Sequence, residues 1–421
     1  MRKINFIRLL CTVFCIIAII IIKIVNLISK TLCINIIVHS KLLLIVFVAI
    51  LALIFCDILL SHRIYKGIRY FWYHFTIKNS LELQMIDAGF YIERNCYIDI
   101  PKIQLSFNNN FSAAELKIRD SLKFDKKLDD VVLSSALGKF VVERHYITDD
   151  GNYYIYELID GSVSFKLVFN SFKEFLNYNK GIDTYKLFLD SRTAVKLQHC
   201  LLVGQTGSGK TYELYNLLLQ MMNKQVKYEL YFADPKGSSL AIIGSTINEN
   251  RTAVSVEEII DLLEQFVSLM RERKGELKEL LKTQIDGDYS TFGLSPYVFI
   301  CEEYASFASV LQSMEKKSRD KVKSLLYEII LQGRQLGFFL FLIMQKSDAA
   351  LIDTALRDNM PLKIVLGNSE QQTYITTFGN GVDIPNRHYS VGEGVFTEPT
   401  IAPEPKLLQC PYCKFDILKA F

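Results

Sequence analysis

The chain has 421 residues, half of them hydrophobic, with a mean hydropathy of +0.19 that is high for a wholly soluble protein. Lys and Arg number 48 against 45 Asp and Glu, a net charge of +3, but residues 1–79 alone carry +9. The remainder is therefore near −6, which excludes a body that binds nucleic acid through overall positive charge.

Two apolar segments, Phe6–Ile28 and Leu42–Leu60, begin the chain, and each has about the length needed to span a bilayer. We predict a transmembrane helical hairpin in residues 1–60. A cleaved signal peptide is the alternative, but the first segment is long for one and lacks a clear small-residue cleavage site. Basic residues flank the hairpin on both outer sides, which predicts that both ends lie in the cytoplasm.

Residues 61–81 form a basic, aromatic juxtamembrane segment, and residues 82–190 predict a small α+β adaptor domain without a catalytic constellation. Alternating apolar residues predict four strands, with a hairpin turn at 149–152. A helix is predicted over Phe111–Leu122. The predicted strands are Tyr97–Phe107, Lys139–Thr148, Asn152–Leu158 and Ser164–Phe169.

Residues 191–400 switch to alternating strands and helices, which predicts an α/β domain with a largely parallel sheet, and residues 401–421 are expected to form a C-terminal tail. The predicted strands are Cys200–Val203, Tyr228–Ala233, Tyr297–Cys301, Phe338–Met344 and Leu362–Val365. The predicted helices are Lys210–Asn223, Ser255–Lys282, Asp320–Leu336 and Asp353–Asn359.

The first of these strands leads into a run that fits G-x-x-x-x-G-K-[ST]. The run is Gly204, Gln205, Thr206, Gly207, Ser208, Gly209, Lys210 and Thr211. A strand, a glycine-rich turn and a helix N-terminus point several backbone N–H groups at one anion. We therefore predict a site for ATP and Mg²⁺, with Lys210 on the β/γ-phosphates and Thr211 on the metal.

Two carboxylates, Glu302 and Glu303, follow an apolar strand, as a nucleotide motor requires. We assign Glu302 to the Mg²⁺ shell and Glu303 to polarising the attacking water; a solvated charge pair is the alternative. Gln345, at the end of the next strand, is a candidate sensor of the γ-phosphate. Arg334 is a candidate arginine finger that reaches across a subunit boundary, or else an ordinary surface arginine.

Five cations crowd the stretch after the carboxylates, where a ring could line its channel with them and contact a DNA backbone. They are Lys316, Lys317, Arg319, Lys321 and Lys323. A solvated helix start is the alternative. The nine Cys are scattered, and the lone Cys410-x-x-Cys413 lacks the two further ligands of a zinc site.

Several of these runs, taken in order, resemble the FtsK/SpoIIIE family of DNA-pumping ATPases. They are residues 199–210, Ala233-Asp234-Pro235-Lys236-Gly237, Glu302–Phe307, Gly333-Arg334-Gln335-Leu336-Gly337, Met344–Ser347 and Asp358–Pro361. The resemblance covers about residues 195–380. It implies a RecA-like P-loop core, a homo-hexameric ring, and ATP-driven movement of DNA. Glu302 departs from the family's usual Asp.

Only about 40 residues follow the predicted motor core, too few for a winged-helix DNA reader. The chain thus looks more like the coupling proteins of Gram-positive conjugative elements, which act at the bacterial cell membrane with a relaxase and channel proteins. The alternatives are a chromosome-partition translocase, a protein-secretion ATPase, and a membrane-anchored scaffold that binds nucleotide without hydrolysing it.

Overall fold

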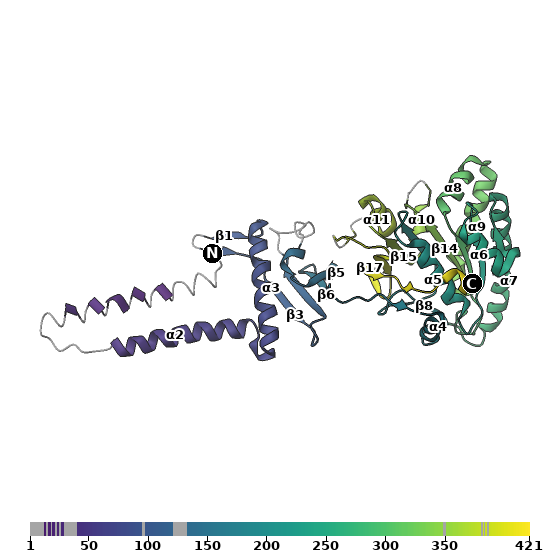
Figure 1. Cartoon of the computed structure of the whole chain (residues 1–421). Coiled ribbons are helices and arrows are strands. Elements are labelled where there is room, and N and C mark those ends of the chain that lie inside the picture. Colours follow the sequence, from purple (N-terminus) through teal and green to yellow (C-terminus); the bar gives the residue numbers. More distant parts are fainter. Residues whose placement is uncertain are drawn as a thin grey trace. The chain divides into compact units, whose positions relative to one another are not determined.

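The computed structural model describes residues 40–94, 97–120, 133–347, 351–379 and 387–421, with positions 382 and 384 and scattered positions between 12 and 28. The chain forms two compact units, residues 1–163 and 164–421 (Figure 1). The predicted boundary at residue 190 was wrong, because side chains such as Phe175 and Phe188 pack in the core of the second unit.

The first unit is built on a four-stranded antiparallel sheet, in the order β3-β4-β6-β5. Its strands are β3 (Ile103–Phe107), β4 (Ala113–Arg119), β5 (Phe140–Ile147) and β6 (Tyr153–Asp160). The other elements are α2 (Ser40–Ser61), η1 (Ile64–Lys66), α3 (Ile68–Asp87), the hairpin of β1 (Ile92–Arg94) and β2 (Tyr97–Asp99), and η3 (Ser134–Ala136). Leu81 and Met85 of α3 share a core with Leu105 and Leu116 of the sheet.

Two predicted elements of this unit were wrong: the strand over Tyr97–Phe107 is divided into β2 and β3, and residues Ala113–Arg119 of the predicted helix Phe111–Leu122 form strand β4. Alternate side chains of β4, namely Ala114, Leu116 and Ile118, are buried, which is the period of a strand that covers a core on one face. The hairpin predicted at 149–152 is present and joins β5 to β6.

The predicted transmembrane hairpin is not supported. No helix among the described residues combines the length and the apolar character that a membrane crossing requires. Most of the first predicted segment, Phe6–Ile28, lies outside the described residues, and the second falls within α2.

The second unit contains an eight-stranded mixed sheet in the order β12-β11-β13-β14-β10-β15-β16-β17. The first six strands in this order are parallel, and β16 and β17 are antiparallel. The strands are β10 (Cys200–Gly204), β11 (Glu229–Ala233), β12 (Thr252–Ala253), β13 (Tyr297–Cys301), β14 (Phe338–Met344), β15 (Leu362–Leu366), β16 (Glu393–Glu398) and β17 (Ala402–Gln409). The largely parallel α/β fold predicted from the sequence is confirmed.

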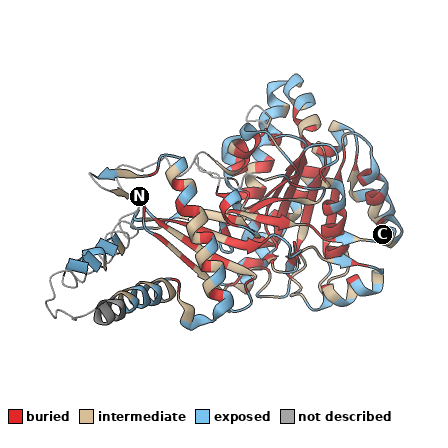
Figure 2. Cartoon of the chain, turned by 60° about the vertical axis from the view of Figure 1, so that its left-hand side comes forward, coloured by how far each residue is buried: buried red, intermediate tan, exposed pale blue. Residues whose placement is uncertain are grey.

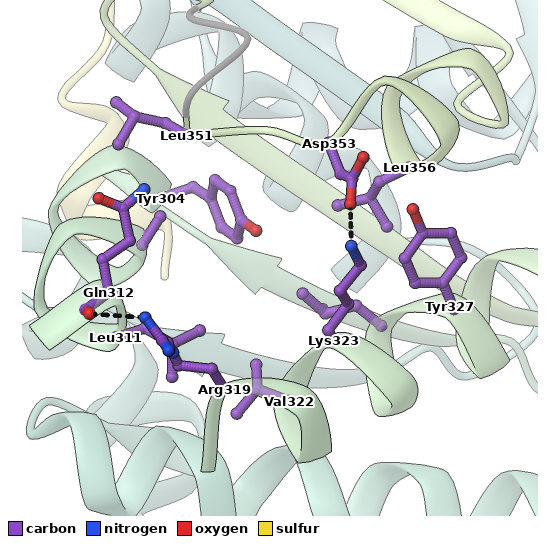
Figure 3. A pocket seen from close by; sticks show the side chains of 12 residues that line it. Tyr304, Leu311, Gln312, Arg319, Val322, Lys323, Tyr327, Leu351, Asp353 and Leu356 are labelled. Carbon is purple, nitrogen blue, oxygen red and sulfur yellow. Dashed lines mark hydrogen bonds and ion pairs between the residues drawn. The ribbon is translucent and has the colours of Figure 1, made fainter. Parts of the chain in front are cut away.

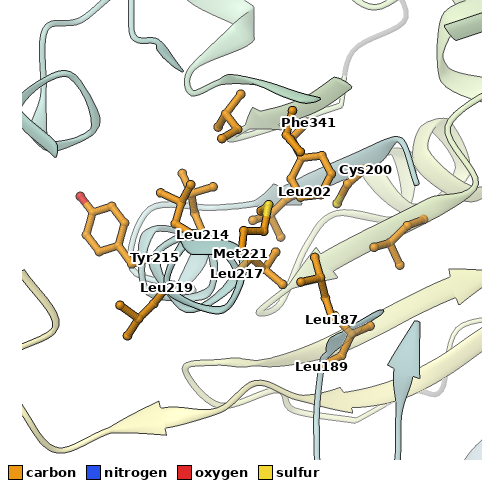
Figure 4. Packing of buried hydrophobic residues seen from close by; sticks show 14 of the residues in the cluster. Leu187, Leu189, Cys200, Leu202, Leu214, Tyr215, Leu217, Leu219, Met221 and Phe341 are labelled. Atoms are coloured by element: carbon orange, nitrogen blue, oxygen red, sulfur yellow. The ribbon is translucent and has the colours of Figure 1, made fainter. Parts of the chain in front are cut away.

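Helices cover both faces of this sheet, and its strands β10, β13 and β14 are apolar throughout (Figure 2). On one face, Leu214, Leu217 and Met221 of α5 point toward Leu202 and Phe341 of the sheet (Figure 4). On the other, Phe266 of α7 packs edge-on against Phe299 and Phe338. The helices are α4 (Phe172–Lys180), α5 (Lys210–Met222), α6 (Ser239–Asn248), α7 (Val256–Leu280), α8 (Tyr304–Ser313), α9 (Lys316–Leu336), α10 (Thr354–Asp358) and α11 (Gln371–Phe378).

Residues 401–421, predicted to form a tail, belong to the fold instead. β17 pairs with β16, and β18 (Tyr412–Cys413) pairs with β7 (Val168–Phe169) from the start of the unit. The small elements that complete the unit are β8 (Lys186–Phe188), β9 (Ala194–Lys196), η4 (Glu249–Arg251) and η5 (Ile417–Ala420).

Candidate nucleotide-binding site

The predicted phosphate loop connects β10 directly to α5, with Gly209 as the residue that precedes the helix. Gly207 and Gly209 have φ angles of 82° and 99°, which L side chains rarely adopt. A Cβ on Gly204 would lie 2.6 Å from the carbonyl oxygen of Leu366, so that position has no room for a side chain. The glycines thus give the loop the tight curve on which a phosphate cradle depends.

Lys210 and Thr211 begin α5 at the end of this loop. The Lys210 ammonium donates to the carbonyl of Gln205 at 3.2 Å, and the Thr211 hydroxyl lies 3.5 Å from Oε1 of Glu302. Burial lowers the pKa of Lys210, while the carboxylates of Glu303 and Glu302 act in the opposite direction. A cation held close to the loop and to two carboxylates is suited to bridge them to a bound polyphosphate.

The parallel strands bring further polar residues to the same edge. Asp234, Glu302 and Gln345 each follow the carboxyl end of a strand, β11, β13 and β14 respectively. Because the carboxyl ends of parallel strands meet at one edge, these residues lie beside the phosphate loop after β10.

The carboxyl group of Glu302 is largely buried. The residue is 8% exposed, and burial, followed by the nearby Asp234 and Glu303, raises its pKa to about 7. Its Oε2 is buried and has no hydrogen-bond partner among the described residues. An orphaned carboxylate oxygen beside a threonine hydroxyl fits the oxygen-ligand preference of Mg²⁺, with Thr211 and Glu302 as the residues that would hold it.

Glu303 sits in an unusual backbone conformation, with a φ of 53° at the residue before α8. Its Oε1 accepts a hydrogen bond from Nε2 of Gln345 at 2.8 Å and pairs with Nζ of Lys236 at 3.2 Å. Gln345 also meets the Thr206 hydroxyl of the phosphate loop, at 3.5 Å. The structure therefore joins the predicted sensor, the predicted base and the phosphate loop in one network.

Sequence reasoning assigned no role to Asp234 or Lys236, although both stand in a run that resembles the family. Asp234 is fully buried and accepts hydrogen bonds from the backbone N–H groups of Lys236, Ser238 and Ala241. An acid directly after an apolar strand was the signal that could have identified this position.

A second missed contact lies on the other side of the loop. Gly392 donates its N–H to the Ser208 carbonyl at 2.9 Å, and a Cβ on Gly209 would lie 2.9 Å from the Gly392 nitrogen. The turn before β16 thus packs directly on the phosphate loop, and no sequence signal pointed to it.

Arg334 does not join this site within one chain. It lies exposed in the last turn of α9, beside the amino ends of the strands, because α9 ends at Leu336 and β14 begins at Phe338. With Lys274 and Asp288 it lines a cavity of about 730 Å³. The phosphate loop is at the opposite, carboxyl edge of the sheet.

The five predicted DNA-contacting cations all lie in the first half of α9, and each of them is exposed. Lys321 pairs with Glu264 of α7, and Lys323 pairs with Asp353. Arg319 donates to the Gln312 carbonyl at 3.1 Å, and with Lys323 it borders a cavity of about 410 Å³ (Figure 3). Lys316 and Lys317 are exposed at the helix start.

Cys410 and Cys413 are free thiols whose pKa values burial raises, that of Cys413 to about 12. Within the described ranges, no group of three or more His, Cys, Asp or Glu side chains is arranged to hold a metal ion.

The chain is similar to known proteins in both sequence and fold. Residues 179–348 match the family model described as FtsK/SpoIIIE family. The Ftsk domain-containing protein YdcQ of Bacillus subtilis (strain 168) is 28% identical over 185 residues, which are 44% of this chain and 37% of YdcQ. The match thus spans little more than a third of that relative's length.

Among solved structures, the chain is similar to the monomer form of the pCW3 conjugation coupling protein TcpA with ATPgS. That match has a TM-score of 0.50 and 16% identity, and covers 80% of this chain and 95% of TcpA. EssC (ATPases 2 and 3) from Geobacillus thermodenitrificans matches with a TM-score of 0.41 and 15% identity, over 55% of this chain and 43% of EssC. The TcpA match shows a shared fold.

Proposed function

We propose that this protein is an ATP-driven DNA translocase that acts as a coupling protein in conjugative DNA transfer, because residues 179–348 match the FtsK/SpoIIIE family model and contain the phosphate-loop motif. The observation that carries the proposal is the convergence of Lys210, Glu302 and Glu303 at one sheet edge. The fold shared with TcpA, a conjugation coupling protein, supports the choice of process.

In this proposal the phosphate loop, residues 204–211, binds the triphosphate of ATP, and Lys210 contacts its β- and γ-phosphates. Mg²⁺ held by Thr211 and Glu302 would neutralise charge on the phosphate oxygens. Glu303 polarises the attacking water, and Gln345 senses the γ-phosphate through its contact with Thr206.

Arg334 lies far from the phosphate loop of its own chain, so its proposed role as an arginine finger requires a neighbouring subunit. The proposed homo-hexamer supplies one. It would also bring six copies of the α9 cations around a channel, which compensates for the net negative charge of residues 80–421. A relaxase and channel proteins at the bacterial cell membrane are the partners that this function implies.

Hydrolysis and transfer by a Lys210→Ala variant test the proposal. The purified full chain should hydrolyse ATP faster when DNA is added, and Lys210→Ala should abolish hydrolysis because it removes the phosphate-contacting cation. Lys173→Ala, which removes an exposed lysine of α4, is the matched control. In a mating assay, transfer by Lys210→Ala near the wild-type frequency would overturn the proposed role in conjugation.

The same experiment separates the alternatives. Wild-type protein that binds ATP but does not hydrolyse it, with or without DNA, would favour the nucleotide-binding scaffold. Hydrolysis stimulated by DNA without any defect in mating would favour a chromosome-partition role.

A further inference from the structure

The turn after β11 brings a lysine into contact with the carboxylate that we assign to water activation. Nζ of Lys236 lies 3.2 Å from Oε1 of Glu303, and Nε2 of Gln345 lies 2.8 Å from the same oxygen. Two donors, one from the turn after β11 and one from the end of β14, therefore contact the same carboxylate oxygen. Oε2 of Glu303 is then the oxygen left to accept a proton from water.

The backbone that carries Lys236 is held firmly. The Asp234 carboxylate accepts from the N–H of Lys236 at 3.1 Å and from the N–H of Ser238 at 2.6 Å, and the Asp234 carbonyl accepts from Gly237 at 2.9 Å. Asp234 itself is fully buried. Gly237, with a φ of 61°, completes a turn that other residues adopt only with strain.

Glu303 needs such support, because it is a non-glycine residue in the left-handed region. Conformations of this kind persist only where the surroundings determine them, and they are common at active sites. A second carboxyl group, that of Glu302, is its neighbour in the chain, and the Lys236 ammonium is the cation that lies within 3.2 Å of Glu303.

From this geometry we infer that Lys236 is a positioning residue: together with Gln345 it clamps Oε1 of Glu303 and so aims Oε2 at the attacking water. The inference rests on the proposed ATP hydrolysis. Lys236 acts through Glu303, so its loss lowers turnover and leaves nucleotide binding intact. Its side chain is 46% exposed, so its removal does not open a cavity in the core.

Steady-state ATP hydrolysis by Lys236→Met tests the role. We expect kcat to fall about 10- to 100-fold, as for a misaimed catalytic group, with KM for ATP within twofold of wild type. Lys236→Arg, which keeps a cation within reach, should restore most of kcat. The matched control is Lys227→Met, which removes a lysine that pairs with Glu229 at the other end of β11 and should leave kcat unchanged.

Three results would overturn the inference: a kcat for Lys236→Met within twofold of wild type, a rise in KM at constant kcat, or no rescue by Lys236→Arg. A rise in KM would mean that Lys236 binds the phosphates instead.

A second measurement does not depend on hydrolysis. In a double-mutant cycle of Lys236→Met with Glu303→Gln, the two changes in thermal midpoint should be non-additive if the clamp exists without nucleotide. Additive changes in the thermal midpoint would overturn the inference that Lys236 holds Glu303. A coupled pair in a protein that does not hydrolyse ATP would instead place the failure with the proposed function.

Discussion

In the four-stranded sheet of the first unit, charged side chains pair with each other. Arg144 bonds both oxygens of Glu157 at 2.6 Å from the opposite strand, and Lys139 reaches Asp160 at 2.5 Å. At the carboxyl edge of the eight-stranded sheet, by contrast, Glu302 keeps an unpartnered buried oxygen and a raised pKa. Satisfied pairs stabilise a fold, whereas unsatisfied charges mark the place where a ligand completes the structure.

The largest effect that this contrast predicts is at Glu303. Glu303→Gln should lower kcat for ATP hydrolysis at least about 100-fold, because the amide cannot accept the proton of water. ATP binding should persist, and the thermal midpoint should stay or rise, because one of the clustered carboxylates is removed. A large drop in the thermal midpoint would contradict this prediction. It would mean that Glu303, at the carboxyl edge of the eight-stranded sheet, stabilises the fold as the paired charges of the first unit do.

The converse applies to Lys139 in the first unit. The Lys139 ammonium donates to Asp160 at 2.5 Å and to the Phe111 carbonyl at 2.8 Å. The hydrogen bond from Lys139, followed by that from the Ser162 hydroxyl, lowers the pKa of Asp160 to about 2. Lys139→Met should cost about 1–3 kcal/mol of stability, because it leaves a largely buried carboxylate without its cation. Chemical denaturation measures this destabilisation. A change in kcat for ATP hydrolysis would contradict the view that this charge pair stabilises the first unit and takes no part in catalysis.

Among the α9 cations, the same reasoning separates two classes. Lys321 and Lys323 already have carboxylate partners, whereas Lys316 and Lys317 are exposed at the helix start. The Lys316→Ala/Lys317→Ala variant should reduce the salt slope of duplex DNA binding by roughly 2, about 0.9 for each phosphate that the protein no longer neutralises. Lys321→Ala/Lys323→Ala should change the slope less. Equal slopes for both double variants and wild type would place DNA on another surface.

The same contrast explains what the sequence could predict. Strands β13 and β14 were predicted to the residue, because a parallel strand covered by helices is a continuous apolar run. The phosphate loop was predicted from a motif of fixed spacing, and the two carboxylates from their place directly after an apolar strand. β4 was mistaken for a helix, since its single buried face leaves a weak alternating pattern over only seven residues.

Contacts between distant segments could not be predicted in this way. The approach of Gly392 to the phosphate loop, and of Lys236 to Glu303, depends on which strands are neighbours in the sheet. The place of Tyr412 and Cys413 in the fold depends on β18 pairing with β7, and these two strands lie at opposite ends of the second unit's sequence. Local periodicity carries no information on such pairings.

The smallest effect concerns a buried pair of histidines in the first unit. Nδ1 of His62 lies 3.0 Å from Nδ1 of His74, so one ring must donate and the other accept. Burial, followed by the nearby charges of Lys78, His62 and Arg63, lowers the pKa of His74 to about 3. The ring of Tyr70 stacks on His74 at 6.0 Å, and its hydroxyl accepts from Arg63.

A histidine that stays neutral when folded makes stability depend on pH in a definite direction. Between pH 6.5 and pH 3 the unfolded chain binds a proton that the folded chain excludes, so the stability of the first unit falls as pH falls. From pH 6.5 to 5.5 the decrease should be about 1 kcal/mol, since one pKa unit corresponds to roughly 1.4 kcal/mol. Asp150 and Asp160, with pKa values of about 2, act in the same direction but only below about pH 4.

Trp72, the single tryptophan of the chain, lies on the same helix and reports unfolding of this unit by its fluorescence. Urea unfolding at pH 7.5 and 5.5 should therefore show a lower midpoint at the acidic pH for wild type. The difference should be smaller for His74→Phe, which keeps an aromatic ring in the core but has no group to protonate. A His74→Phe protein with the full wild-type difference would place the pH dependence elsewhere in the unit, because the ring of His74 would then contribute none of it.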